Sequence, residues 1–292
     1  MRHAYLIIAH NNPKILYAQV KILKDIDTDF YYHLDRRFDF DKNKLIELAG
    51  DSRCIFLPSK KVQWGKYSQI DCELRLLESA IQGDYDYYHL ISGVDMPIKT
   101  KIEIDNFFQK NNGKEFIHFD KKKVAQQVTD RIALYHFCPG RKNYERKLNG
   151  FFYKIQKLLK VNRLAGLEWE VQKGANWFSI TRDLANYVVQ NKKLIKKRFA
   201  CSFCGDEVFL QTLVWNSEFK NNLYDQTFAD DYHSCMRYID WERGNPYVFT
   251  KEDLQELIEV DYLFARKFSS DAKNGEIVEL LIDRLAKESY DI

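Results

Sequence analysis

Residues 4–10 of the chain read AYLIIAH, and Asn11, Asn12 and Pro13 follow directly. An apolar run without alternation is typical of a strand that is buried on both faces of a parallel sheet. Pro13 suits the first turn of a helix, and the apolar residues of 15–23 continue that helix. The opening stretch therefore predicts the first strand–helix unit of an α/β fold.

The alternation continues to residue 120. We expect further strands at 30–34, 54–57, 87–91 and 116–119, and helices at 45–48, 67–81 and 101–110. Such an order predicts a parallel, Rossmann-type nucleotide-binding sheet with helices on both faces. Ligands of these sheets lie beyond the carboxyl ends of the strands, which places His10, Asp35 and the turn from Ser92 to Asp95 on one rim. Neither GxGxxG nor GxxxxGK[ST] occurs, so the sequence supports neither a dinucleotide site nor a P-loop.

The second half of the chain is less regular. Residues 121–170 form a basic, aromatic and poorly patterned insertion with a helix expected at 151–159. After it we expect a strand at 174–180, a helix at 182–190, a strand and loop at 231–241, and closing helices at 251–258 and 261–287. Since no linker interrupts the chain, we predict a single domain (1–292) with a nucleotide-sugar half (1–120), the variable insertion (121–170) and an acceptor and catalytic half (171–292).

Charge and hydropathy exclude several functions. Among 292 residues, 45 basic and 42 acidic side chains give a net charge of +3, which argues against nucleic-acid binding. Basic patches at 121–123, 141–160 and 192–198 leave an anionic substrate or peripheral contact with a membrane surface open. No apolar run approaches the roughly 20 residues of a membrane span, and the run 4–9 is too short for a signal peptide. We therefore expect a cytoplasmic protein, with the inner face of the membrane as an alternative location.

Residues 199–215, FACSFCGDEVFLQTLVW, hold the main chemical candidate. Apolar residues at 208, 210, 213 and 214 predict a helix that opens at Gly205-Asp206-Glu207. Local sequence alone favours a capping role, with Asp206 as N-cap and Glu207 in the first turn; a general base at Glu207 is the alternative. Cys201-x-x-Cys204 has metal or redox spacing, but no second pair accompanies it, so we expect no metal there.

Six blocks, in order, resemble the core-2/I-branching β-1,6-N-acetylglucosaminyltransferases and the related peptide xylosyltransferases of glycosyltransferase family 14. They are VQWGKYSQIDCEL (62–74), HLISGVDMPIKT (89–100), GANWFSITRDLANYVV (174–189), CGDEVFLQTL (204–213), MRYIDWERGNPYVFTKEDL (236–254) and LFARKF (263–268). The resemblance covers most of the chain outside 121–170. It implies a GT-A fold and transfer of a sugar from a UDP-sugar to an acceptor hydroxyl with inversion and without a divalent metal.

The metal-free expectation agrees with the residues at the rim. Most GT-A enzymes hold Mg²⁺ or Mn²⁺ with Asp-x-Asp after the fourth strand, whereas this chain has Ser92-Gly93-Val94-Asp95 there. Asp84-x-Asp86 precedes its strand and Asp39-x-Asp41 lies in a charged loop, so we interpret both as turn carboxylates. We therefore expect no cofactor.

The resemblance also implies residue roles. Glu207 matches the catalytic base, Asp35 a uridine contact and Lys267 the diphosphate-binding lysine; Arg243 is a weaker second cation, for which Arg266 is the alternative. Further nucleotide-sugar contacts are expected at Ala9, His10 and Asp95. Acceptor contacts are expected at Trp177, Tyr238, Trp241 and, by region only, Arg131. One departure is Gly205, where the family has proline before Asp-Glu.

The sequence thus predicts a bacterial-type, inverting transferase whose donor carries GlcNAc or xylose and whose acceptor is a glycan or lipid-linked saccharide. The donor sugar stays open, because the insertion at 121–170 is not recognisable. Two alternatives remain, namely a metal-dependent retaining glycosyltransferase of the same fold and a non-catalytic glycan- or nucleotide-binding protein.

Overall fold

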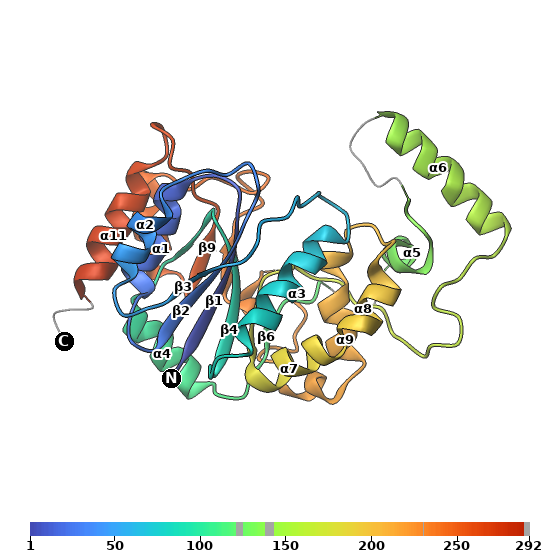
Figure 1. Cartoon of the computed structure of the whole chain (residues 1–292), viewed down its shortest axis with the longest axis horizontal. Helices are drawn as coiled ribbons and strands as arrows, with labels where there is room; N and C mark the ends of the chain where they lie inside the picture. Colours follow the sequence, from blue (N-terminus) through green and yellow to red (C-terminus); the bar gives the residue numbers. More distant parts are fainter. Residues whose placement is uncertain (121–124, 138–142, 230, 289–292) are drawn as a thin grey trace.

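A computed structural model describes residues 1–120, 125–137, 143–229 and 231–288. At its centre is a six-stranded sheet with the order β3-β2-β1-β4-β7-β6 (Figure 1). Its strands are β1 (His3–Ala9), β2 (Thr28–Leu34), β3 (Cys54–Phe56), β4 (Tyr87–Ser92), β6 (Phe116–Ile117) and β7 (Phe178–Thr181). The strands predicted in the first half are therefore present, although β6 is shorter than the expected 116–119.

The sheet is mixed, which corrects the expectation of a purely parallel one. Strands β3, β2, β1 and β4 are parallel, but β7 pairs antiparallel with β4, and β6 antiparallel with β7. The direction of a short buried strand cannot be predicted from its sequence, because the same apolar side chains suit a parallel and an antiparallel neighbour. The parallel half is nonetheless the predicted Rossmann-type unit.

Alternating side chains of β1 show why the run AYLIIA is apolar throughout. Ala4 and Leu6 enter the core on one face of the sheet, whereas Tyr5, Ile7 and Ala9 enter the core on the other. A strand with a core on each face cannot alternate apolar with polar residues. Helices cover both faces, as predicted (Figure 1).

Helices α1, α2 and α4 pack on one face, and α3, α7, α8 and α9 contribute to the core on the other. The helix bounds are α1 (Pro13–Leu23), α2 (Lys42–Ala49), α3 (Ser68–Ala80), α4 (Lys101–Lys110), α5 (Gln126–Ala133), α6 (Asn143–Leu158), α7 (Arg182–Gln190), α8 (Lys192–Phe199), α9 (Phe209–Trp215), α10 (Leu254–Glu259) and α11 (Glu276–Glu288). Short 3₁₀ turns are η1 (Gly205–Glu207), η2 (Glu218–Asn222), η3 (His233–Cys235) and η4 (Lys251–Asp253). None of the helices in the described residues has the length and hydrophobicity needed to span a bilayer.

A second, three-stranded sheet has the order β5-β9-β8 and lies beside the carboxyl end of β4. It consists of β5 (Asp95–Pro97), β8 (Arg237–Ile239) and β9 (Phe264–Arg266). The prediction of helices throughout 261–287 is wrong at β9, because three residues are too few to show a period. Strand β8 confirms a strand within 231–241.

The described part of the insertion contains two helices. Helix α6 includes most of the predicted 151–159 but begins earlier, and α5 was not predicted. Between α7 and α9, the basic segment 192–199 forms α8, also unpredicted. The helix predicted to follow Gly205-Asp206-Glu207 is present as α9, although residues 205–207 form the 3₁₀ turn η1 and α9 begins only at Phe209.

Candidate active site

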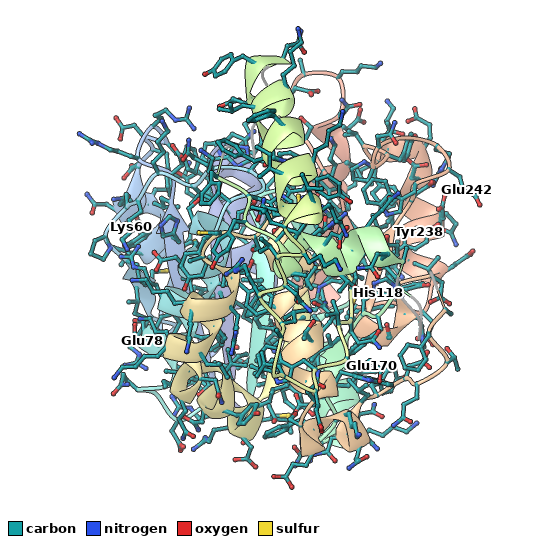
Figure 2. All side chains as sticks on the ribbon, turned by 90° about the vertical axis from the view of Figure 1, so that its right-hand side faces the viewer. Lys60, Glu78, His118, Glu170, Tyr238 and Glu242 are labelled. Carbon is teal, nitrogen blue, oxygen red and sulfur yellow. The ribbon has the colours of Figure 1, made fainter. Side chains whose placement is uncertain are left out.

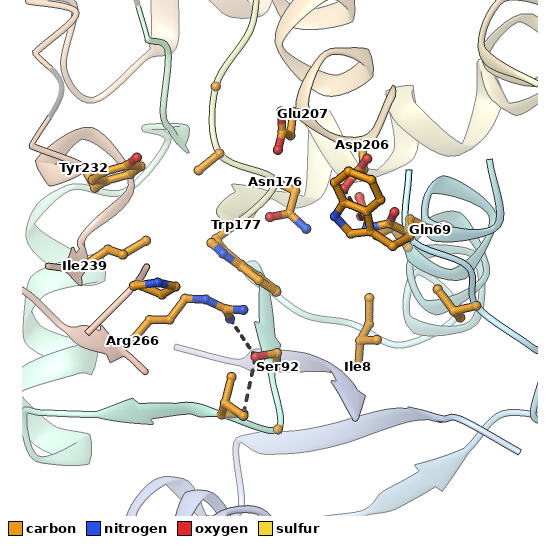
Figure 3. A pocket seen from close by; sticks show the side chains of 18 of the residues that line it. Ile8, Gln69, Ser92, Asn176, Trp177, Asp206, Glu207, Tyr232, Ile239 and Arg266 are labelled. Carbon is orange, nitrogen blue, oxygen red and sulfur yellow. Dashed lines mark hydrogen bonds between the residues drawn. The ribbon is translucent and has the colours of Figure 1, made fainter. Parts of the chain in front are cut away.

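A cavity of about 620 Å³ opens where β1 and β4 end and the small sheet begins (Figure 3). Ile8, His10 and Asn11 line it from the end of β1, and Ser92, Gly93 and Val94 from the end of β4. At Gly93 a Cβ atom would lie 2.8 Å from Cβ of Ala9, so glycine lets the β4 turn approach the end of β1. The cavity thus occupies the rim where parallel sheets bind ligands.

Glu207 stands on the cavity wall with 38% of its side chain exposed. Its Oε2 accepts a hydrogen bond of 2.8 Å from Nη1 of Arg131, and Nζ of Lys173 lies 3.9 Å away. The backbone carbonyl of Glu207 accepts from the N–H of Gly174, which fixes η1 against the segment that leads to β7. These contacts orient the carboxylate of Glu207 while its exposed part stays accessible to a ligand in the cavity.

Asp206, the neighbour of Glu207, is buried and accepts a 2.8 Å hydrogen bond from Nε2 of Gln69. Burial, together with the charge of Glu207, raises the pKa of Asp206 to about 7. The predicted capping role for Asp206 is therefore wrong: its side chain turns to α3, and no side-chain hydrogen bond caps η1 or α9. The presence of glycine at position 205 has a local explanation, because a Cβ atom there would lie 2.2 Å from Oγ of Ser202.

Glu73 adds a third carboxyl group to this corner of the cavity, from α3. It is fully buried, and neither oxygen makes a hydrogen bond of normal geometry within the described residues. Burial and the charge of Asp206 raise the pKa of Glu73 well above its usual range. Because an acid in such surroundings stays protonated, Glu73 contributes a neutral, buried carboxyl group to the cavity wall.

Arg266, at the end of β9, supplies a cation on the opposite wall (Figure 3). Its Nη1 donates to Oγ of Ser92 at 2.8 Å and to Oδ1 of Asp95 at 2.6 Å. The guanidinium lies over the ring of Trp177, 4.4 Å from the ring centroid. Two hydrogen bonds and a stacked ring hold this cation in one position, which suits binding of an anionic group.

Several predicted site residues meet in the cavity. His10, Trp177, Trp241 and Glu207 line it, and Arg131 reaches Glu207 from α5. Asp95 is buried behind the wall, where it holds Arg266. The alternative cation, Arg266, is thus the one that faces the cavity.

Other predicted residues lie outside the lining. Ala9 is buried below Gly93, and Arg37 hydrogen-bonds Asp35 and holds its pKa below the usual range. Lys267 is half-buried beside Arg266, and its ammonium group has no ion pair within the described residues. Arg243 pairs instead with Asp240, Asp253 and Glu256, and Tyr238 donates to Glu256 within the third core cluster. Both side chains are thereby engaged away from the cavity.

Sequence reasoning missed Glu73, Gln69, Lys173 and Asn176, all of which line the cavity. One signal was available, since Glu73 interrupts the apolar stripe of the helix predicted at 67–81. A charged residue on a buried stripe requires a partner or a function. The sequence around Gln69, Lys173 and Asn176 has no comparable feature.

The described residues contain no group of three His, Cys, Asp or Glu side chains that could hold a metal ion. Of the two Asp-x-Asp pairs, Asp84 binds Arg182 and Asp86 accepts from the backbone N–H of Arg2, at the amino end of β4. Asp41 is the N-cap of α2. The cysteines of Cys201-x-x-Cys204 are both free, and burial raises the pKa of Cys204 to about 12.

Comparison with known proteins connects this geometry to a family. The family model described as "Branch: Core-2/I-Branching enzyme" matches residues 3–258. The chain belongs to the Core-2/I-branching enzyme family. Human xylosyltransferase 2 is 25% identical over 307 residues, which cover 96% of this chain and 33% of the relative. Human β-1,3-galactosyl-O-glycosyl-glycoprotein β-1,6-N-acetylglucosaminyltransferase is 23% identical over 301 residues, covering 92% of this chain and 66% of the relative.

This member of the Core-2/I-branching family spans about a third of the length of the xylosyltransferases that it matches. Among solved structures, mouse xyloside xylosyltransferase 1 in its apo form covers 90% of this chain and 96% of its own, with 10% identity and a TM-score of 0.35. A score this low adds no argument to the sequence match. Family membership therefore rests on residues 3–258.

Proposed function

We propose that this chain is a glycosyltransferase that moves a sugar from a UDP-sugar to a hydroxyl group of a glycan or lipid-linked saccharide. The proposal rests on one observation: a single cavity has the carboxyl group of Glu207 on one wall and the fixed guanidinium of Arg266 on another. An acceptor hydroxyl needs a base, and a nucleotide diphosphate needs a cation. The names of the relatives, a xylosyltransferase and an N-acetylglucosaminyltransferase, support the same class of reaction.

In the proposed reaction Glu207 takes the proton of the acceptor hydroxyl as that oxygen attacks the anomeric carbon of the donor. The bond between the anomeric carbon and the phosphate oxygen breaks, and its electron pair leaves with UDP. Attack opposite the leaving group inverts the configuration. Arg131 holds the carboxylate of Glu207 in place through a hydrogen bond, so that it is positioned to accept the proton.

Positive side chains take the role that a metal ion has in many enzymes of the predicted fold. Arg266 faces the cavity, and Lys267 follows it with an ammonium group that is not ion-paired within the described residues. Together they can neutralise charge that develops on the leaving diphosphate. We therefore propose a metal-independent reaction.

The corner formed by Glu73, Asp206, Gln69 and Asn176 suits a neutral sugar. Protonated carboxyl groups and amides both donate and accept hydrogen bonds, as sugar hydroxyl and acetamido groups require. Oδ1 of Asp206 and both oxygens of Glu73 are buried and make no hydrogen bond of normal geometry within the described residues, so a sugar that reaches them would supply a partner. This favours an uncharged donor sugar such as GlcNAc or xylose over a uronic acid.

Release of UDP from a panel of UDP-sugars tests the proposal without knowledge of the acceptor. Each donor is incubated with the wild-type protein and with Glu73→Gln, with and without EDTA. We expect slow, EDTA-resistant hydrolysis of one neutral UDP-sugar. Tight UDP binding without release from any donor would instead indicate a binding protein, and release that requires added Mn²⁺ would indicate the metal-dependent alternative.

A further inference from the structure

Helix α6 presents a row of apolar side chains to solvent. Tyr144, Leu148, Phe151, Ile155 and Leu158, the α6 stripe, are between 37% and 82% exposed. Their spacing of four, three, four and three residues places them on one face of the helix. Figure 1 shows α6 standing away from the body of the molecule, and in Figure 2, which is viewed from that side, side chains project outward along it.

The other side of α6 holds the helix in place. Gln156 is buried and bonds both the backbone N–H and the carbonyl of Tyr135. The hydroxyl of Tyr153 and Nζ of Lys157 both donate to the carboxylate of Asp130 in α5. These residues lie away from the α6 stripe on the helix surface, so the stripe is not needed to attach α6 to the protein.

Exposed apolar side chains are concentrated here. Of the 13 large hydrophobic side chains that are exposed in the described residues, nine lie between Tyr135 and Leu159. Single exposed apolar residues are ordinary, but a contiguous group marks an interaction surface.

The charged residues beside the α6 stripe indicate which partner it binds. Exposed Lys147 and Lys154 flank the α6 stripe on one side. In sequence, residues 143–160 contain five basic residues and one acidic residue. A second copy would bring like charges together across a symmetric contact, which is unfavourable. Aromatic and aliphatic residues on one face with lysines at its edge are typical of helices that lie in the surface of an anionic bilayer.

We propose that α6 docks this protein on an anionic lipid bilayer through the α6 stripe, with Lys147 and Lys154 at the lipid headgroups. The docking does not depend on the proposed activity. It does have a consequence for the site: Asp130, which α6 holds through Lys157, directly precedes Arg131, the partner of Glu207. A bilayer at α6 would therefore lie on the side of the cavity where the base is placed, as an acceptor carried by a lipid requires.

Sedimentation with vesicles tests the docking. The probes are vesicles of pure phosphatidylcholine and of phosphatidylcholine mixed with phosphatidylglycerol, with the whole chain as wild type and as Phe151→Glu/Leu158→Glu. Both replaced side chains are exposed, so the variant should fold. We expect binding to the anionic vesicles that weakens with salt, and a loss of roughly tenfold or more in the double variant, because two apolar side chains no longer insert.

Two further variants separate the contributions. Lys147→Glu/Lys154→Glu should lose binding to anionic vesicles with little change for neutral ones. Ile26→Glu, at a residue that is 79% exposed but far from α6 in sequence, is the matched control and should bind like wild type. Equal sedimentation with and without anionic vesicles, or a Phe151→Glu/Leu158→Glu variant that binds normally, would overturn the proposal. A wild-type dimer that the same variant dissociates, without vesicle binding, would assign the stripe to a second copy instead.

Discussion

Glu207 and Arg131 are 76 residues apart in sequence, yet Oε2 of the first lies 2.8 Å from Nη1 of the second. The contact joins the most recognisable block of the chain to its least recognisable segment, because Arg131 belongs to the insertion. A variable segment thus contacts the proposed base directly. In the proposed function, this one ion pair would couple acceptor choice to the chemistry of the base.

Replacing Glu207 with Gln should lower turnover by about 10² to 10⁴, the usual effect of losing a general base, while UDP still binds. The side chain keeps its size, so the cavity should be preserved. Steady-state kinetics and calorimetric titration with UDP measure the two effects. Glu47→Gln, at an exposed residue of α2, is the matched control. Turnover near that of wild type would remove Glu207 from the role of base.

Arg131→Ala should reduce transfer to the acceptor by about tenfold to a hundredfold, the range for losing a hydrogen bond to a charged group. Affinity for UDP should not change, since Arg131 is not on the wall that holds Arg266. Arg131→Lys should restore part of the activity by keeping the charge without the planar fork. An Arg131→Ala protein that loses UDP affinity instead would place Arg131 at the donor.

Lys267→Ala should weaken binding of UDP more than binding of uridine, because only UDP carries the diphosphate. Titration calorimetry with both ligands gives the ratio, and Lys273→Ala, at an exposed residue outside the cavity, serves as control. Equal losses for UDP and uridine would mean that Lys267 does not contact phosphate. Lys267 is the better position for this test than Arg266, whose removal would leave the buried Asp95 without its cation.

Treatment with EDTA should leave both donor hydrolysis and transfer intact. The reason is the side-chain charge of Arg266 on the cavity wall, next to which Lys267 follows in the sequence. Activity that disappears with EDTA and returns with Mn²⁺ would contradict this expectation. A protein exchanged into metal-free buffer provides the baseline.

Asp206→Asn should change how stability depends on pH. In the folded state the carboxyl keeps its proton up to about pH 7, whereas the unfolded chain loses it near the ordinary value of 3.8. The raised pKa of Asp206 therefore has no effect on the free energy of unfolding below about pH 4, and it lowers that free energy increasingly from there to about pH 7. The free energy of unfolding of the variant should rise relative to wild type across this window, by on the order of 4 kcal/mol at most.

Chemical denaturation of both proteins at several pH values measures that difference. A difference that stays constant from pH 4 to 7 would mean that Asp206 is ionised in the folded protein. Glu73 titrates in the same sense and is coupled to Asp206, whose charge raises the pKa of Glu73, so the comparison is repeated in a Glu73→Gln background.

Sequence predicted the elements whose patterns are long or uniform. The continuous run in β1 and the stripe of α3 were sufficient, and α7 has the predicted bounds of 182–190. Strand β9 and the direction of β7 were not predictable, since three residues show no period and pairing depends on distant partners. At the site, motif positions led to Glu207 and Trp177, but Arg243 failed to reach the cavity because three nearby carboxylates hold it. Lys173 and Gln69 join the cavity only through tertiary packing.

The position of Arg266 limits where the chain can be truncated in an expression fragment. The family match ends at residue 258, but β9 is the central strand of the small sheet. Its last residue, Arg266, binds Ser92 at the end of β4 and Asp95 at the start of β5. An expression fragment cut at the end of the match would remove that strand and leave Asp95 buried without a counter-charge. The shortest fragment that keeps this contact must therefore extend beyond the end of the family match to include residues 259–268.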